Sequence, residues 1–331
     1  MCCRPRCWST GSVLSAAPEP WRALRERAPD APIALLARRR RPRFLVALVI
    51  AVALALTGTS IGLALLVRHA PPVLTHSTFV DNFNGPAGAS PNYGFAHRVW
   101  YSDPCWRTGC GGDTPTRYSS ANAYLDGHGH LVLVARRGAH GTCGTGPCLY
   151  TSARLTMVRW SGPSYGSTSF SQQYGTFSAR IKLPTGKGFW PAFWLVGSNI
   201  ARVGWPRSGE IDVLEAYHGP HLVEQHVAFG RAGRVHRYGS GWPLPAGQSL
   251  SGWHTYTVVW SPSGITWEVD GRTTLSLSAA QVGPDWASEF EHPFSLILDL
   301  AVGGLAGMPS PSAHWPAKML VAWVRVTQTG H

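Results

Sequence analysis

Alternating apolar and polar residues, interrupted by Gly and Pro, run through most of the chain after residue 79. The pattern is clearest over 174–183, 264–270 and 294–302, and a last strand is expected near 319–327. Successive side chains of a strand point to opposite faces, so this period of two places the apolar residues on one buried face. No stretch in this region has a long helical apolar period. Many short strands with regular turns indicate an all-β sandwich or barrel.

Composition and charge agree with a folded domain of this kind. Apolar residues make up 44% and charged residues 14% of the 331 residues, enough for a sizeable core. The formal net charge is +12, but residues 1–43 hold ten arginines against three acidic side chains. Because the excess positive charge lies mainly in this leader, we expect no nucleic-acid partner.

An apolar run at 44–67 contains no charged side chain and follows five arginines within 38–43. At about 1.5 Å per residue, a helix of this length crosses a hydrocarbon core of about 30 Å. By the positive-inside rule, 1–43 would be a flexible cytoplasmic tail, 44–67 a membrane anchor, 68–78 a linker and 79–331 an extracellular domain. A cleaved signal peptide, which would leave the protein secreted, is the alternative, and a buried core helix is another.

Cysteines and tryptophans add two further expectations. Four cysteines of the β-region form two C-x4-C pairs, whose spacing does not match the common zinc patterns. In an exported chain we expect disulfides among Cys105, Cys110, Cys143 and Cys148, with a pairing that the sequence does not reveal. Ten of the 15 tryptophans follow residue 180. Tryptophan packs cores, but it is also the flat apolar platform on which sugar rings stack.

Three acidic residues occupy one predicted strand: Glu210, Asp212 and Glu215. Strict alternation puts Glu210 and Asp212 on one face but turns Glu215 toward the core, where an unpaired carboxylate is costly. One extra residue, a β-bulge around Val213 and Leu214, would return Glu215 to the acidic face. The sequence therefore predicts a bulge in this strand.

Three carboxyl groups on one face suit glycoside hydrolysis. They repel one another, so at least one holds its proton well above the usual pH range. In retaining glycosidases one carboxylate attacks the anomeric carbon while a protonated one supplies the leaving oxygen. A metal site or an acidic strand without chemistry would use the same residue types, so the spacing alone leaves these alternatives open.

The segment Glu210–Glu215 resembles the bulged active-site signature of glycoside hydrolase family 16, the laminarinase-like endo-β-1,3-glucanases. The similarity extends over most of 79–327 and includes the segments 81–88, 150–155, 174–177, 180–184, 188–194, 205–206, 253–256 and 301–304. The resemblance implies a concanavalin-like jelly-roll β-sandwich of two antiparallel sheets, here preceded by one N-terminal transmembrane helix. It makes 79–331 a catalytic domain.

The resemblance also implies roles for single residues. Glu210 would be the nucleophile that carries the glycosyl-enzyme and Glu215 the acid/base, with Asp212 between them as the residue that tunes the nucleophile. The expected substrate-binding residues are Arg154, Trp190, Trp194, Trp205 and His226. Trp190 and Trp194 are four apart in an extended stretch and so share a face; core packing is the alternative for each tryptophan. His254 is expected to be a hydrogen-bonded core residue.

Several positions depart from the family pattern. Asp299 stands where the family usually has asparagine, and His226 is out of the usual register of the family histidine. The segment 103–118 replaces a stretch that lines the glucan-binding end in relatives. Asn82 and Ala322 stand at the carboxylate positions of a structural calcium site, so we expect no calcium, no other metal and no cofactor.

The sequence thus predicts a monomeric, retaining, endo-acting hydrolase of β-glucan, with β-1,3-glucan as the first substrate. A transglycosylase that remodels cell wall or capsule would use the same residues. Mixed-linkage glucan and galactan are alternative substrates. A third possibility is a β-glucan-binding protein without catalysis, although such relatives generally lack one or both glutamates.

Overall fold

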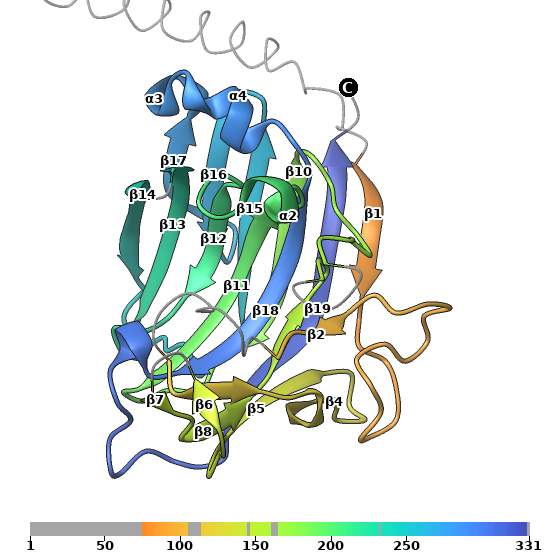
Figure 1. Ribbon diagram of the computed structural model, residues 1–331, viewed down its shortest axis with the longest axis vertical. Helices are drawn as coiled ribbons and strands as arrows, with labels where there is room; N and C mark the ends of the chain where they lie inside the picture. The colour runs from red at the N-terminus through yellow and green to blue at the C-terminus, as the bar shows by residue number, and fades with distance from the viewer. Residues whose placement is uncertain (1–74, 105–113, 144–145, 160–164, 232, 330–331) are drawn as a thin grey trace, which may run out of the picture. The chain divides into compact units, whose positions relative to one another are not determined.

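The computed structural model describes residues 75–104, 114–143, 146–159, 165–231 and 233–329. Within these ranges two large β-sheets pack face to face, as the sequence predicts for a sandwich (Figure 1). The ten-stranded sheet follows the spatial order β17 (Arg272–Ser278), β16 (Gly264–Val269), β15 (His254–Ser261), β10 (Gly175–Lys182), β19 (Ala317–Thr329), β5 (Leu131–Arg137), β8 (Tyr150–Ser152) and β3 (Thr116–Tyr118). On this sheet β1 (Thr75–Asp81) also pairs with β19, and β4 (Ala123–Leu125) with β5.

The second sheet is the one that carries the acidic residues. Its seven strands follow the order β14 (Arg234–Pro243), β13 (Leu222–Arg231), β12 (Glu210–Glu215), β11 (Phe189–Gly197), β18 (Phe294–Val302), β9 (Arg154–Thr156) and β2 (Tyr101–Ser102). Among the described strand pairs all are antiparallel except β3 with β8, which is a short parallel pair. The predicted sandwich of antiparallel sheets is therefore confirmed, with this one local exception.

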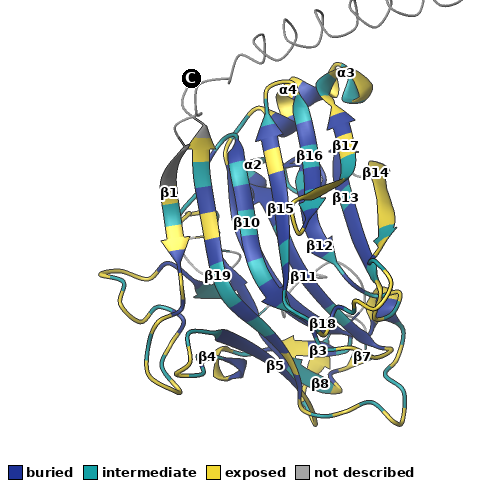
Figure 2. Cartoon of the chain, turned by 180° about the vertical axis from the view of Figure 1, so that it is seen from behind, coloured by how far each residue is buried: buried dark blue, intermediate teal, exposed yellow. Residues whose placement is uncertain are grey.

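The core lies between the two sheets and follows the predicted alternation (Figure 2). On β10 the side chains of Phe177, Ala179 and Ile181 are fully buried while their neighbours are partly exposed. On β16 the same holds for Ile265 and Trp267. Strand β18, which lies between β11 and β9, is buried along its whole length. The side chains on its face away from the core are also covered, as Ile297 is in a second apolar cluster.

Helices are few and short in the described part of the chain: α2 (Ile200–Val203), α3 (Ala279–Val282), α4 (Asp285–Phe290) and the 3₁₀ turns η1 (Ser120–Asn122) and η2 (Gly304–Ala306). Gly283, with φ of 77°, and Pro284 separate α3 from α4, because neither residue fits the interior of a continuous helix. None of these helices is long and apolar enough to span a membrane. The predicted anchor at 44–67 and the tail at 1–43 lie outside the described residues.

The first strand begins earlier than the sequence indicates. β1 starts at Thr75, inside the segment 68–78 that was expected to be a linker, and pairs from there with the end of β19. The polar stretch Thr75–Ser77 has no apolar period, so nothing in the sequence marks it as a strand. Backbone pairing with β19 therefore defines this start.

One of the expected disulfides is present. Cys143 and Cys148 are bonded, with their Cα atoms 5.0 Å apart, and close the hairpin of β6 (Thr142–Cys143) and β7 (Gly146–Pro147). This assigns the pairing that the sequence left open for these two residues. Cys105 and Cys110 lie outside the described residues.

Candidate active site

A β-bulge in β12 sets the geometry of the site. Asp212 lies opposite His226 on β13, but Glu215 lies opposite Glu224, so β12 has one residue more than β13 over this stretch. The same extra residue appears against β11, where the register shifts between the partners of Asp212 and Leu214. The side chains of both bulge residues are buried in the core. The predicted bulge is confirmed, and it places all three carboxyl groups on the outer face of the seven-stranded sheet.

Groups from both sheets stabilise this irregular backbone. The buried side chain of Gln225, on β13, donates a hydrogen bond of 3.0 Å to the Val213 carbonyl oxygen. Thr274, on β17 of the opposite sheet, donates in turn to the Gln225 side-chain oxygen. The Trp267 indole N–H donates to the Asp212 carbonyl oxygen at 2.8 Å. A buried carbonyl that leaves the regular ladder is costly unless it finds a donor, so these contacts stabilise the bulge.

Indole groups bind the two glutamates. Trp190 donates its N–H to Glu215 Oε1 at 2.8 Å, and Trp205 donates to Glu210 Oε2 at 3.1 Å. Trp190 lies on β11 and is partly exposed, whereas Trp205 precedes β12 and exposes 42% of its surface. Both tryptophans therefore have polar contacts with the acidic residues and are not simple core residues.

The electrostatics keep protons within the cluster of carboxyls. Burial raises the pKa of Glu210 from its usual 4.5 to about 7, and the negative charge of Glu215 adds to this effect. The N–H of Trp205 and two nearby arginines oppose the rise. Burial raises the pKa of Asp212 well above its usual 3.8, and the charges of Glu210 and Glu215 raise it further. The cluster therefore carries less negative charge near neutral pH than three independent carboxylates would.

A second network extends from the acids toward β9. Trp194 donates its N–H to Asp299 Oδ1 at 2.8 Å, and the Arg154 guanidinium carbon lies 4.9 Å from the centroid of the Trp194 ring. Tyr118 donates to the other oxygen of Asp299, and Asp103 forms an ion pair with Arg154 at 3.5 Å. Burial raises the pKa of Asp299, while Arg154 and the hydrogen bonds oppose the rise. Only 4% of the Arg154 surface is exposed, so this residue is buried among its partners.

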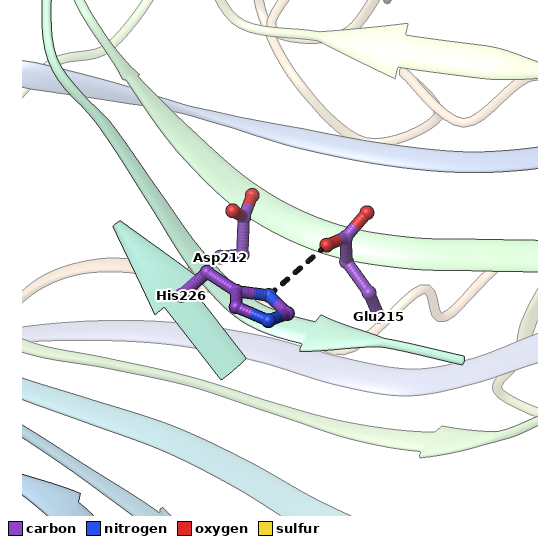
Figure 3. Close-up of side chains that lie close together, drawn as sticks. All are labelled: Asp212, Glu215 and His226. Carbon is purple, nitrogen blue, oxygen red and sulfur yellow. Dashed lines mark ion pairs between the residues drawn. The ribbon is translucent and has the colours of Figure 1, made fainter. Parts of the chain in front are cut away.

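His226 joins the acidic cluster from β13 (Figure 3). Its Nδ1 atom lies 3.4 Å from Glu215 Oε2. Asp212, Glu215 and His226 each offer one ligand atom within 4.8 Å of the other two, so a divalent cation could bind these three atoms.

The structure thus brings together every residue expected in the site. It also adds residues that the sequence analysis missed, among them Tyr217, Arg237 and Glu224. Tyr217 packs edge-on against the Trp190 ring with centroids 5.7 Å apart, and the Arg237 guanidinium lies 5.7 Å from the Trp205 ring centroid. No apolar period marks either residue, because one lies in a loop and the other on the exposed edge strand β14. Glu224, by contrast, is two residues from His226 on one strand, which a search for shared faces could have found.

His254, as expected, lies apart from this site. Its Nδ1 contacts Asp270 Oδ2 at 2.7 Å and its Nε2 contacts the Ser249 carbonyl at 3.0 Å. The residue is buried, so both ring nitrogens have partners within the ten-stranded sheet and its loops. His254 is therefore a hydrogen-bonded structural residue.

Known proteins share this architecture. The catalytic domain of an endo-1,3-beta-glucanase (laminarinase) from Thermotoga petrophila superposes with a TM-score of 0.66 at 31% identity, covering 78% of this chain and 100% of that domain. The endo-beta-1,3-glucanase from Pyrococcus furiosus gives a TM-score of 0.64 at 33% identity, covering 79% and 100%.

Sequence comparison gives further relatives. Glucan endo-1,3-beta-glucosidase A1 of Niallia circulans is 38% identical over 178 residues, which is 50% of this chain and 26% of that protein. Beta-glucanase of Rhodothermus marinus is 33% identical over 190 residues, or 54% of this chain and 62% of the relative. The chain thus spans less than two thirds of the length of these relatives. Residues 137–325, which include the acidic strand, match the sequence profile of Glycosyl hydrolases family 16. On this match, which covers more than half of the chain, the protein belongs to glycosyl hydrolases family 16.

Proposed function

We propose that the protein is a retaining, endo-acting β-glucan hydrolase that cleaves β-1,3-glucan. The observation that carries this proposal is the bulge in β12, because it returns Glu215 to the face that holds Glu210 and Asp212. The laminarinases among its structural relatives support the choice of substrate. The three acids and their indole donors favour catalysis over simple glucan binding, since binding alone does not need buried carboxyls with raised pKa values.

The mechanism assigns one step to each glutamate. The Glu210 carboxylate attacks the anomeric carbon and forms the glycosyl-enzyme, while Glu215 gives its proton to the departing glycosidic oxygen. In the second step Glu215 takes a proton from water, and the resulting hydroxide oxygen displaces Glu210 from the sugar. The Trp205 N–H favours the charged form of Glu210, and the raised pKa of Asp212 favours the neutral form of that neighbour.

The aromatic residues would hold the glucan on both sides of the acids. Trp205 is exposed and offers an apolar ring next to Glu210, where a sugar can stack. Trp194 is held by Asp299 through its N–H and by Arg154 on its ring. Because Arg154 is almost fully buried, its main role would be to hold Trp194 in place.

A substrate panel tests the proposal. The full chain is offered laminarin, lichenan, galactan and agarose, and new reducing ends are scored, while proton NMR follows the first anomer released. We expect cleavage of laminarin with the β-anomer appearing first. Cleavage of galactan alone, or the α-anomer first, would contradict the proposal, and new long oligosaccharides in the presence of acceptors would identify a transglycosylase.

Glu215→Ala should separate the two chemical steps. The variant lacks the proton donor, so we expect cleavage of laminarin to fall by about 10²- to 10⁴-fold, whereas an activated dinitrophenyl glycoside still forms the glycosyl-enzyme. Azide needs no base, so it should restore turnover of the activated substrate and give a β-glycosyl azide. Mass spectrometry and NMR identify this product. An α-azide, or no rescue at all, would argue against Glu215 as the acid/base.

We also propose that residues 44–67 anchor the protein, with the catalytic domain outside the membrane. The uncharged run and the arginines that precede it support this location. Expressed in a bacterial host, the full chain should sediment with membranes and resist extraction by carbonate, and protease added outside should reach the domain. Release of a processed domain into the medium would instead indicate a cleaved signal.

A further inference from the structure

Two residues of β13 share the outer face with Glu215. The register between β12 and β13 places Glu224 directly opposite Glu215, and His226 is two residues further along the same strand. Side chains two apart on a strand point the same way. Glu224 and His226 therefore both flank the Glu215 carboxyl.

Four ionisable groups form a continuous row on this face. His226 Nδ1 lies 3.4 Å from Glu215 Oε2, and His226 Nε2 lies 3.8 Å from Glu224 Oε2. The other oxygen of Glu224 contacts His218 Nδ1 at 2.6 Å. The His226 imidazole thus lies between the carboxyls of Glu215 and Glu224. Figure 3 shows the first of these two contacts, the ion pair with Glu215. The row ends at His218, whose side chain is 58% exposed.

Electrostatics require such an arrangement at this point. Two carboxylates directly opposite each other on neighbouring strands repel, and the Glu224 side chain is only 7% exposed. The His226 imidazole between Glu215 and Glu224 separates their charges. The His218 imidazole contacts the buried Glu224 carboxyl. A carboxylate next to one ring nitrogen also fixes the orientation and tautomer of an imidazole, so that the other ring nitrogen points in a defined direction.

The neighbouring strand leaves space for the same two side chains. On β14 Gly239 lies opposite His226 and Gly241 lies opposite Glu224. A Cβ atom on Gly239 would overlap the His226 ring, and one on Gly241 would lie 3.1 Å from Glu224 Oε2. The requirement for glycine at position 239 is a steric observation, independent of the charges.

We propose that Glu224 is a positioning residue that acts through His226 to hold the Glu215 carboxyl toward the leaving group. His218 keeps Glu224 in place. The inference rests on the proposed acid/base role of Glu215. It needs no net proton transfer through the row, because Glu215 loses a proton to the leaving oxygen and regains one from water in each cycle.

Leaving-group dependence in the full chain tests the proposal. We compare kcat/KM on phenyl and 2,4-dinitrophenyl β-glycosides of laminaribiose, since only the poor phenolate leaving group needs a well-placed proton donor. Glu224→Gln should lose about tenfold on the phenyl substrate and less than twofold on the dinitrophenyl substrate. Equal losses on both, as from a packing defect, or no loss on either, would overturn the proposal.

Further variants keep the result interpretable. His218→Asn changes an exposed side chain, so folding is not at risk, and it should show the same selective loss at about threefold; an unchanged ratio would count against the row. His221→Asn is the matched control, because the side chain of this exposed histidine contacts the Gln248 carbonyl and takes no part in the row. Glu215→Gln distinguishes the two hypotheses. If Glu215→Gln shows no selective loss on the phenyl substrate, the proposed function fails. If Glu215→Gln shows this loss but Glu224→Gln does not, only the positioning role of Glu224 fails.

Discussion

Replacement of Glu210 by Gln should abolish hydrolysis of laminarin, with a loss of at least about 10⁴-fold in kcat. Glutamine keeps the size of the side chain and can still accept the Trp205 N–H bond, but its amide cannot attack the anomeric carbon. Reducing-end assays measure the loss. Glu268→Gln, on the ten-stranded sheet, is the matched control and should retain full activity.

The same variant should be more stable than the parent at alkaline pH. The pKa of Glu210 is raised to about 7 in the folded chain, so between its usual 4.5 and 7 the folded state holds a proton that the unfolded state has lost. Stability therefore falls as pH rises through this range and stays lower above it. Glutamine does not ionise and removes the effect, which should be about 3 kcal/mol.

Thermal unfolding at pH 4 and pH 8 measures this difference. We expect the melting temperatures of Glu210→Gln and parent to agree at pH 4 and the variant to melt a few degrees higher at pH 8. A variant that loses activity but is less stable at pH 8 would show that the side chain matters for packing. That outcome would contradict the electrostatic account.

Gln225→Leu should cause the largest loss of stability, about 2–4 kcal/mol in the free energy of unfolding. Leucine fills the space but leaves the Val213 carbonyl without its donor, while the Thr274 hydroxyl keeps only its bond to the Trp267 carbonyl oxygen. The bond between Gln225 and the Val213 carbonyl is buried, so the lost donor is not replaced by water. Because the bulge then loses its support, kcat should fall as well, although no catalytic carboxyl is changed.

Urea denaturation measures the loss of stability, and a double-mutant cycle tests its origin. Adding Thr274→Val to Gln225→Leu should cost little more than the single change, because Thr274 has already lost its bond to Gln225. The exposed Gln248 provides the control, and its change to Leu should leave the unfolding free energy within about 0.5 kcal/mol. Additive losses from the two buried changes would indicate that Gln225 and Thr274 act separately.

The sequence predicts the bulge for a physical reason. Alternation alone turns Glu215 into the core, and the cost of an unpaired buried carboxyl is large enough to require a local exception. The apolar faces of β10 and β16 follow from the same period, because burial between two sheets demands it. These features follow from the local alternation of apolar and polar residues, which can be read directly from the sequence.

Other parts of the site could not be predicted in this way. The partners of Asp299 and Arg154 come from strands far apart in the chain, and only the sheet order brings them together. Arg237 and Tyr217 act by proximity to Trp205 and Trp190, without a period or motif of their own. The start of β1 at Thr75 depends on backbone pairing with β19, which polar side chains do not reveal.

The extra residue in β12 has a consequence for how such a strand can change over time. Glu210 and Asp212 occupy even positions and Glu215 an odd one, so the alternation of side chains between the two faces of β12 shifts by one residue between Asp212 and Glu215. Losing or gaining a single residue there would invert every side chain beyond it, whereas the loops at either end can vary in length without this effect. Variation in this enzyme should therefore accumulate as altered side chains within β12 and as altered lengths only outside it.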